Sequence, residues 1–375
     1  MCSSDLRFFA GEALRVAGEL LASVRLDVKV EITREPVGVV GIITPWNFPI
    51  AIPAWKIAPA LAYGNAVIFK PAEITPGCAW ALTDILHRAG LPAGVLNLVM
   101  GKGSTIGPAM IDGVDAISFT GSTGVGHGVR QQATARGARV QLEMGGKNPL
   151  IVVDDADLDI AVNCAIQGAF YSTGQRCTAS SRIIVTKGIA DRFVEALSQA
   201  TSALRVGDAR DTQTQIGPVA SADQLETVNR YIALGQKEGA KLIAGDEPLS
   251  GLPNGYYVRP TLFDHSEQAM TINREEIFGP VASIIRVADY EDAIAVANDT
   301  EFGLTSGICT SSLKIAEDFK RRAEAGMTMV NLPTAGVDYH VPFGGRKASS
   351  YGPREQGSYA REFFTIVKTS YQYSG

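Results

Sequence analysis

Residues 37–49 read Val-Gly-Val-Val-Gly-Ile-Ile-Thr-Pro-Trp-Asn-Phe-Pro, a strand-like apolar run followed by a loop between two prolines. A helical stretch from Ile50 to Ala62 comes next. Strand, loop and helix in this order form the repeating unit of a parallel sheet. The stretch therefore predicts an α/β fold, provided that the same unit recurs along the chain.

The same alternation continues to Glu143. Strands are predicted at Val37–Thr44, Ala66–Phe69, Val95–Val99, Ala116–Phe119 and Arg139–Leu142, and helices at Ile50–Ala62, Thr75–Ala89, Thr105–Ile111 and Val125–Ala135. Such alternation builds a doubly wound parallel sheet, which binds ligands beyond the carboxyl ends of its strands. The chemistry is thus expected in loops that follow strands, and Pro45–Pro49 and Gly121–Gly126 are two unusual loops of this kind.

A second alternating block begins near Leu150 and continues to about Val330. Its strands include Leu150–Val153, Arg182–Val185 and Met327–Val330, so we expect a second α/β domain. The tail from Gln356 to Tyr373 contains the β-rich run Phe363–Thr369 after a glycine-rich loop. An exposed strand of this kind is expected to pair with the sheet edge of another subunit.

The composition fits a well-packed globular protein of two domains. The chain has 375 residues, 46% hydrophobic and 19% charged, with a net charge of −5. The charge and the lack of a basic run argue against nucleic-acid binding. The most apolar long stretch, Ile50 to Phe69, carries Lys56 and two prolines, which argues against a membrane span.

The five cysteines are odd in number and form no Cys-x-x-Cys pair. A disulfide framework and a zinc site are therefore not expected, and the four histidines show no paired spacing that would support any metal site. Reduced thiols fit a cytoplasmic location best. No charged segment followed by an apolar segment marks the N-terminus for export.

The first six residues, Met-Cys-Ser-Ser-Asp-Leu, read poorly as the opening of a domain, whereas an amphipathic helical pattern runs from Arg7 to Leu21. We expect a truncated chain whose first six residues are foreign to the natural protein. Resequencing of the source DNA across this junction would test that expectation.

Cys177 is the candidate nucleophile among the cysteines. It lies in Ser172-Thr-Gly-Gln-Arg-Cys-Thr-Ala-Ser-Ser181, a polar stretch just before a strand, where a substrate would reach the thiol. Arg176 beside it favours the thiolate, which is the nucleophilic form. An arbitrary cysteine is more often a small core residue, and that interpretation is preferred for Cys164 and Cys309.

Glu143 and Asn47 are candidates for acid–base and electrostatic roles. Glu143 ends a strand and enters Glu-Met-Gly-Gly-Lys-Asn148, where two glycines let the backbone approach a ligand; the alternative is an ordinary surface carboxylate. Asn47 lies between two prolines and two aromatic residues. A rigid amide of this kind can stabilise an oxyanion by about 3 kcal/mol, although asparagine also serves simply to form turns.

Two segments are candidates for binding a dinucleotide. Phe119-Thr-Gly-Ser-Thr-Gly-Val-Gly126 follows a strand and opens a helix, the arrangement that holds a pyrophosphate. Its Gly-x-x-Gly-x-Gly spacing departs from the usual fingerprint, so a plain strand-to-helix turn is equally compatible. Lys70 and Glu73 follow another strand and supply a cation and a ribose-binding carboxylate, or else form a solvated loop.

Together these segments resemble the aldehyde dehydrogenase superfamily over about residues 7–373. Seven motifs stand in the order and approximate spacing of that family: Pro45-Trp-Asn-Phe-Pro49, Lys70-Pro-Ala-Glu73, Phe119-Thr-Gly-Ser-Thr123, Leu142-Glu-Met-Gly-Gly-Lys147, Gly174-Gln-Arg-Cys177, Glu275-Glu-Ile-Phe-Gly-Pro280 and Pro342-Phe-Gly-Gly-Arg346. The resemblance implies a Rossmann-type NAD(P)-binding domain at 1–145, which lacks its N-terminal part and includes an oligomerisation arm at 18–36. It also implies a catalytic domain at 146–345 and a C-terminal segment with an oligomerisation strand at 346–375.

The resemblance also implies a role for each matching residue. Cys177 would attack the aldehyde, Asn47 and the Cys177 backbone N–H would stabilise the oxyanion, and Glu143 would activate the water that hydrolyses the thioester. Lys56 matches a proton-relay lysine of the family. The cofactor positions are Ile43, Thr44, Pro45, Trp46, Lys70, Ala72, Glu73, Gly103, Gly121, Ser122, Glu276 and Phe278, and the aromatic residues of the substrate tunnel are Phe48, Trp55 and Phe343.

The C-terminal segments, Arg176 and Glu73 narrow the range of expected substrates and cofactors. Segments 330–347 and 350–357 are most similar to family members that oxidise α-ketoglutaric semialdehyde (2,5-dioxovalerate), with succinate and glutarate semialdehydes as competitors. Arg176 is a candidate for holding the distal carboxylate of such a substrate. Glu73 favours NAD over NADP, because a carboxylate repels a 2′-phosphate, but dual use stays open. The retained arm implies a homodimer or homotetramer.

Two other functions remain open from the sequence. A cysteine hydrolase would use Cys177 without a cofactor, but only His340 lies near a motif that could supply its base. An inactive truncated remnant that only assembles or binds nucleotide is the second alternative.

Overall fold

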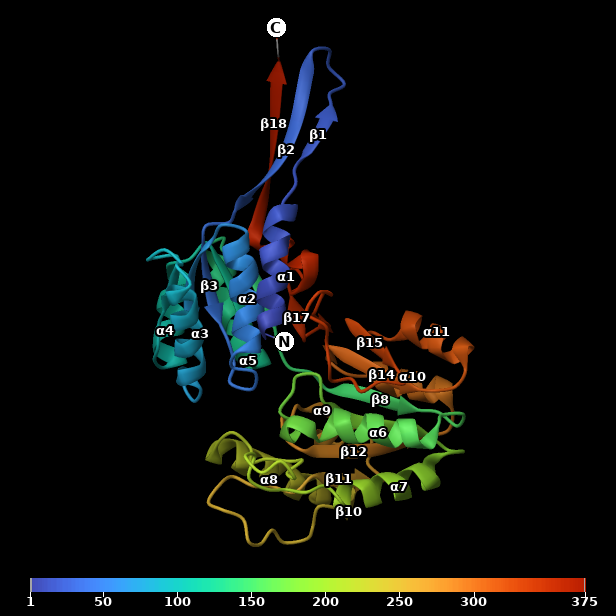
Figure 1. Ribbon diagram of the computed structural model, residues 1–375. Helices are drawn as coiled ribbons and strands as arrows, with labels where there is room; N and C mark the ends of the chain where they lie inside the picture. Colours follow the sequence, from blue (N-terminus) through green and yellow to red (C-terminus); the bar gives the residue numbers. More distant parts are fainter. Residues whose placement is uncertain (1, 374) are drawn as a thin grey trace. The chain divides into compact units, whose positions relative to one another are not determined.

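The computed structural model describes residues 2–373 and 375 and divides into two compact units (Figure 1). The first unit comprises residues 1–144, 337–344 and 350–375, and the second unit comprises residues 145–336 and 345–349. Each unit has its own sheet and its own buried clusters of apolar side chains.

The first unit is built on a six-stranded sheet in the order β17-β7-β6-β3-β4-β5. Its strands are β3 (Val39–Ile43), β4 (Ala66–Lys70), β5 (Leu96–Leu98), β6 (Ala116–Thr120), β7 (Arg139–Glu143) and β17 (Ser350–Tyr351). All neighbours pair in parallel except β17, which runs antiparallel to β7. The predicted α/β class and the five predicted strands are confirmed, with each boundary within two residues.

The crossover helices of the first unit follow the predicted pattern. They are α2 (Ala51–Ala62), α3 (Pro76–Arg88), α4 (Gly103–Asp112) and α5 (Thr123–Ala135), with α1 (Cys2–Glu12), the 3₁₀ turn η3 (Gly357–Ala360) and α12 (Arg361–Phe364) at the chain ends. Helix α2 is buried along most of its length because Ala54, Ile57 and Ala60 pack in the core with Val40 and Phe69 of the sheet. Each large apolar side chain buried in this way contributes about 1.5–3 kcal/mol.

The arm is a three-stranded antiparallel sheet in the order β1-β2-β18. It joins β1 (Glu19–Ala22) and β2 (Val28–Pro36) to β18 (Thr365–Tyr373), so residues 28–36 and 365–373 lie side by side although they are far apart in the sequence (Figure 1). Most of its side chains are exposed, including the apolar ones of Leu20, Leu21, Ile366 and Val367. The tail therefore pairs with a strand of its own chain through one edge of β18. The other edge of β18 has no strand partner among the residues described.

Two sequence predictions near the chain ends are wrong in part. The helix expected from Arg7 to Leu21 ends at Glu12, a single 3₁₀ turn η1 (Ala13–Arg15) follows, and Glu19–Ala22 is strand β1. Residues 2–6 belong to α1. At the other end, Phe363 and Phe364 are buried in α12, and the strand begins only at Thr365. At the N-terminal end apolar side chains with helical spacing continue into a strand, and at the C-terminal end a β-rich run begins inside a short helix, so the local pattern misplaces both boundaries.

The second unit holds a seven-stranded sheet in the order β10-β11-β12-β9-β8-β14-β15. Its strands are β8 (Asn148–Val152), β9 (Ser180–Thr186), β10 (Lys241–Ala244), β11 (Thr261–Asp264), β12 (Val281–Val287), β14 (Thr305–Cys309) and β15 (Met327–Val330); β13 (Phe302–Gly303) and β16 (Arg346–Lys347) form a separate pair. Only β10 is antiparallel to its neighbour in the large sheet. The helices are α6 (Leu158–Ala169), α7 (Ala190–Ser202), α8 (Ala222–Lys237), α9 (Thr271–Arg274), α10 (Tyr290–Asn298) and α11 (Leu313–Arg322).

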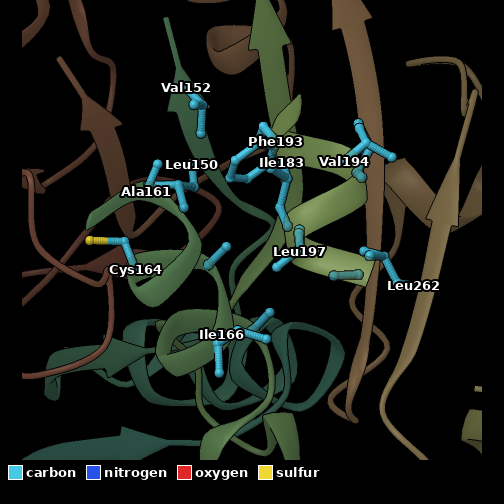
Figure 2. Packing of buried hydrophobic residues seen from close by; sticks show 14 of the residues in the cluster. Leu150, Val152, Ala161, Cys164, Ile166, Ile183, Phe193, Val194, Leu197 and Leu262 are labelled. Carbon is cyan, nitrogen blue, oxygen red and sulfur yellow. The ribbon is translucent and has the colours of Figure 1, made fainter. Parts of the chain in front are cut away.

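The largest core cluster of the second unit joins its sheet to α6 and α7 (Figure 2). Leu150 and Ile183 from the sheet meet Phe193 and Leu197 from α7, all of them fully buried. Cys164 lies in the same cluster, and Cys309 is equally buried, which confirms that both are small core residues. Among the described residues, no helix combines the length and the apolar character that crossing a bilayer requires.

Candidate active site

Four parallel strands of the first unit end at one edge of its sheet. In spatial order, β4, β3, β6 and β7 lead into residues 70–73, 43–48, 121–122 and Glu143. The strand order changes direction between β3 and β6, because β4 lies on one side of β3 and β6 on the other. Such a switch point is where open α/β sheets bind nucleotides. The first unit thus brings most of the predicted cofactor positions together.

Glu73 lies beside a cavity of about 210 Å³ that is lined by Pro71, Ala72, Glu73, Pro76, Met100, Gly101 and Lys102. Its Oε1 accepts a hydrogen bond of 2.6 Å from the backbone N–H of Gly103, at the start of α4, and lies 3.8 Å from Lys70 Nζ. The half-exposed carboxylate can still accept hydrogen bonds from a ribose. The cavity, the carboxylate and the lysine together fit the adenosine part of a dinucleotide.

The glycine-rich loop is shaped by close packing and by the start of α5. A side chain at Gly121 would overlap the Phe119 ring, and one at Gly126 would overlap the Met144 side chain. Ser122 precedes the first turn of α5 and its side chain makes no capping hydrogen bond. The Ser122 side chain therefore does not occupy the N–H groups of that turn, which are the groups that hold a pyrophosphate at the start of a helix.

Asn47 lies in the half-buried loop that joins β3 to α2. The backbone N–H of Ile52 donates to the Phe48 carbonyl, so this loop is tied to the first turn of α2, which begins at Ala51. On the same helix, the Trp55 ring lies 5.4 Å from the ring of Phe343. The first unit therefore brings two of the three predicted substrate aromatics into contact.

Lys56 is part of a buried charged cluster that the sequence did not fully reveal. Its ammonium group is 1% exposed, forms an ion pair with the buried carboxylate of Glu355 and donates to Ser118 Oγ at 2.8 Å. Ser118 Oγ in turn bonds to Gln141. Glu355 was not predicted as a site residue. The one sequence signal for it was Lys56 itself, because a lysine in an otherwise apolar helix needs a buried counter-charge.

Glu143 lies in the same unit, is 2% exposed and accepts a hydrogen bond of 2.5 Å from Ser350 Oγ. Burial raises the pKa of Glu143 well above its usual value, and the negative charge of Glu355 raises it further. The Ser350 hydroxyl and the positive charge of Lys56 act in the opposite direction. A carboxyl group with a raised pKa suits proton transfer near neutral pH.

In the second unit, Cys177 lies before β9, at the amino end of the parallel strands and not at their carboxyl end. The chain reaches it through a turn, η2 (Tyr171–Gly174), in which Ser172, Thr173 and Gly174 all have positive φ of 56°, 57° and 64°. A side chain at Gly174 would overlap the Gly279 carbonyl. Left-handed backbone costs about 1–2 kcal/mol for each non-glycine residue, so the loop before Cys177 is strained.

Arg176 is half-buried, and its hydrogen bonds go to neutral groups. One terminal nitrogen donates to Ser172 Oγ at 2.8 Å and the other to the Gln167 carbonyl at 3.5 Å. Nε is buried without a hydrogen-bond partner, and no carboxylate pairs with Arg176 among the described residues. Burial lowers the pKa of Arg176, but arginine stays charged. A cation in this state can pair with a ligand anion.

Glu276 is held by the two glycines that follow Glu143 in the sequence. Its Oε1 accepts a hydrogen bond of 3.0 Å from the Gly146 N–H, and a side chain at Gly145 would overlap the carboxylate. The pKa of Glu276 is raised to about 7 by burial. The hydrogen bond from Gly146 and the positive charge of Lys147 limit this increase. Phe278, two residues later, has a positive φ of 57°. Both predicted residues thus lie on one constrained loop of the second unit.

Lys147 is a buried residue of this unit. It ends the motif Leu142–Lys147 but was not predicted as a site residue. It is 1% exposed, its Nζ has no hydrogen-bond partner among the described residues, and burial lowers its pKa to about 7. The predicted set is therefore divided between the units: Cys177, Arg176, Glu276 and Phe278 belong to the second, and all the other predicted residues to the first.

Sequence comparisons with known proteins agree with the resemblance to aldehyde dehydrogenases. The model of the aldehyde dehydrogenase family matches residues 1–370. The chain is 49% identical over 368 residues to the alpha-ketoglutaric semialdehyde dehydrogenase of Bacillus subtilis, covering 97% of this chain and 75% of the relative. It is 42% identical over 372 residues to the 2,5-dioxopentanoate dehydrogenase of Saccharolobus solfataricus, covering 98% and 77%.

Solved structures agree. Betaine aldehyde dehydrogenase from Staphylococcus aureus in complex with NAD⁺ superimposes with a TM-score of 0.96 at 34% identity, covering 100% of this chain and 76% of that chain. An NADP-dependent enzyme from E. coli gives a TM-score of 0.95 at 36% identity, covering 99% and 77%. These relatives favour aldehyde oxidation over a cofactor-independent cysteine hydrolase.

Proposed function

Because the chain belongs to the aldehyde dehydrogenase family, it oxidises an aldehyde with NAD or NADP, and we propose that this aldehyde is an ω-carboxylated semialdehyde such as α-ketoglutaric semialdehyde. The observation that carries the substrate proposal is Arg176, a half-buried cation next to Cys177 with a buried, unsatisfied Nε. Two relatives, an alpha-ketoglutaric semialdehyde dehydrogenase and a 2,5-dioxopentanoate dehydrogenase, support the same substrate.

The proposed reaction begins at Cys177. Its thiolate forms a C–S bond to the aldehyde carbon, and the carbonyl electrons move to the oxygen, which becomes an oxyanion. The side-chain amide of Asn47 and the N–H of Cys177 stabilise that oxyanion. When bound, NAD(P) would supply the hydride acceptor that oxidation of the tetrahedral carbon requires. The product of this stage is a thioester on Cys177.

Glu143 is proposed to complete the reaction as a general base. Its deprotonated carboxylate takes a proton from water as the water oxygen attacks the thioester, and the C–S bond then breaks to release the acid. Lys56 and Glu355 lie in the same buried cluster as Glu143 and offer its proton a route away from the site. We assign Glu276 and Phe278 to the nicotinamide half of the cofactor.

NAD is the proposed preference over NADP. Glu73 lines the cavity that fits adenosine, and its carboxylate would accept hydrogen bonds from both ribose hydroxyls. A 2′-phosphate would meet the same negative charge, although Lys70 at 3.8 Å from Glu73 reduces the repulsion. Dual use with a lower efficiency for NADP is the expected result.

A homodimer or a homotetramer assembled through the arm is also proposed. The sheet β1-β2-β18 exposes a row of apolar side chains, and its edge strand β18 offers backbone groups to a partner strand. A location in the cytoplasm is supported by Cys78, Cys164 and Cys309, which are free thiols.

The nucleophile and the base can be separated by pre-steady-state kinetics. We expect Cys177→Ala to form no NADH from an aldehyde. Glu143→Gln should release a burst of one equivalent of NADH and then turn over about 10²–10⁴-fold more slowly, because only thioester hydrolysis needs the base. Cys78→Ala is the matched control and should behave as the wild type. A Glu143→Gln enzyme without a burst would contradict the assigned order of steps.

The pH dependence tests the environment of Glu143. Only the deprotonated base is active, so its raised pKa places the acid limb of thioester hydrolysis above the pH range of an ordinary glutamate. Replacing Glu355 by glutamine removes one cause of the increase, so the limb should move to lower pH. Glu362→Gln, a change at an exposed carboxylate of the same unit, should leave it in place. A limb that stays fixed or rises in Glu355→Gln would refute this account.

The substrate class is tested by initial rates with both cofactors. Arg176→Met should lower kcat/KM for α-ketoglutaric semialdehyde by about 10- to 100-fold, the usual loss when one charged hydrogen bond is removed. The value for pentanal, which lacks the carboxylate, should change little. Arg192→Met, at an exposed arginine of the same unit, is the control. Preference of the wild type for unsubstituted aldehydes would overturn the substrate proposal but not aldehyde oxidation.

Assembly through the arm is tested by sedimentation. Val367→Glu and Leu20→Glu place charges on its exposed apolar side chains, which are 52% and 74% accessible. Because a partner would bury these positions, both variants should sediment as a smaller species than the wild type. Leu313→Glu, at an 82% exposed position of the second unit, should not. Unchanged sedimentation of all three variants would exclude the arm as the interface.

A further inference from the structure

The carbonyl groups of three successive residues at the proposed nucleophile each accept a hydrogen bond from a buried side chain. Asn148 Nδ2 donates to the Cys177 carbonyl at 2.7 Å and to the Ala179 carbonyl at 3.0 Å. Thr334 Oγ1 donates to the Thr178 carbonyl at 2.7 Å. Asn148 is 2% exposed and Thr334 is fully buried. Residues 177–179 are thus held through their backbone by side chains from distant parts of the second unit.

These bonds restrain both peptide planes that flank the Cys177 α-carbon. The plane after it is fixed by the bond from Asn148 to the Cys177 carbonyl. The plane before it is fixed because the Ala179 N–H donates to the Arg176 carbonyl at 3.1 Å. The N–H of Cys177 lies in the same peptide plane as the Arg176 carbonyl and points in the opposite direction. The directions of the thiol and of the N–H proposed to bind the oxyanion are therefore both set.

Asparagine is the side chain that this position requires. Besides its two donated bonds, Asn148 accepts a bond of 3.0 Å at Oδ1 from the Thr305 N–H at the start of β14. A side-chain amide offers this combination of donors and acceptor, whereas a carboxylate has no donors. Gly146 leaves room for the contact, since a β-carbon there would lie 2.7 Å from Asn148 Oδ1 and 2.9 Å from the Cys177 carbonyl oxygen.

The surrounding backbone shows why the loop needs such restraint. Ser172 and Thr173 have the left-handed conformation that side chains disfavour, so the segment before Cys177 would relax if it were released. On the other side, the register of β8 and β9 shifts at Asn148 and Pro149, which places an irregularity directly behind the loop. Asn148 connects the loop to β8 and β14 at this point.

We propose that Asn148 is a positioning residue of the dehydrogenase reaction, holding the Cys177 loop so that its thiol and its N–H meet the aldehyde together. Thr334 assists through Thr178. This inference rests on the proposed role of Cys177 as the nucleophile. It concerns the orientation of that residue, not its presence or its ionisation.

The main test is Asn148→Asp. This change keeps the size of the side chain and the oxygen that accepts from Thr305, but it replaces the nitrogen that donates to the Cys177 and Ala179 carbonyls by an oxygen that cannot donate. The first-turnover rate of NADH formation should fall about 10- to 100-fold, the usual effect of a small misplacement of a reacting group, with little change in KM for NAD.

Asn65→Asp is the matched control. Asn65 is also 2% exposed, its amide also donates to two carbonyls, those of Ala60 and Phe364, and its Oδ1 also accepts a backbone N–H. The Asn65→Asp variant should lose stability as Asn148→Asp does, but it should keep the first-turnover rate of the wild type.

Peptide-level mass spectrometry after iodoacetamide treatment supplies the second readout. Alkylation requires an accessible thiolate but no alignment with an oxyanion site, so in Asn148→Asp the labelling rate of Cys177 should stay within about threefold of the wild type. Cys164 and Cys309 are buried and should remain unlabelled while the unit is folded. If these two cysteines become labelled in proportion to the loss of activity, unfolding explains the loss and the proposal is wrong.

A second pair of variants keeps the proposal testable if Asn148→Asp does not fold. Thr334→Val removes the bond to Thr178 and should slow the first turnover several-fold. Thr201→Val removes an equally buried bond of 2.7 Å to the Leu197 carbonyl and should not. Equal effects within either pair would refute positioning by Asn148 and Thr334. Activity in Cys177→Ala would instead refute the proposed nucleophile, so the two failures are distinguishable.

Discussion

Parallel strands all end at the same edge of a sheet, and this constraint organises the chemistry of the first unit. Each crossover helix returns the chain to the opposite edge, so every loop after a strand arrives where the previous one did. Residues that are widely separated in sequence, such as Asn47, Glu73 and Glu143, therefore line one edge of the sheet. The apolar packing of α2 and its neighbours stabilises the sheet, and the sheet alone determines where these side chains are presented.

The second unit obeys the same constraint but uses the other edge. Cys177, Glu276 and Asn148 all stand at the beginning of strands, where a parallel sheet offers no switch point of the usual kind. The position of the thiol is set instead by local means: a left-handed turn, glycines that admit carbonyl and carboxylate groups, and side chains that bind backbone carbonyls. The pKa values of Glu143 and Glu276 are both raised mainly by burial, so desolvation of single side chains controls proton affinity in both units.

The sequence predicts the central part of each sheet well, because short apolar strands and helices with clear boundaries depend on local pattern. It fails where pairing is long-range. Glu19–Ala22 carries the spacing of a helix but becomes a strand because β2 lies next to it, and no local pattern shows that pairing. The same limit applies to the site. Cys177 and Glu143 stand in motifs, whereas Glu355 and Asn148 act through partners far away in the chain, and a polar residue shows its partner only after folding.

The pairing of β2 with β18 also has a consequence for the order of events during synthesis. Residues 28–36 leave the ribosome long before residues 365–373, the strand that covers them. Until then β1 and β2 form an isolated two-stranded hairpin, which is marginally stable in water. The arm can therefore close only after residues 365–373 have been made. A polypeptide whose translation stops before them would lack this surface and would be excluded from any assembly that uses it.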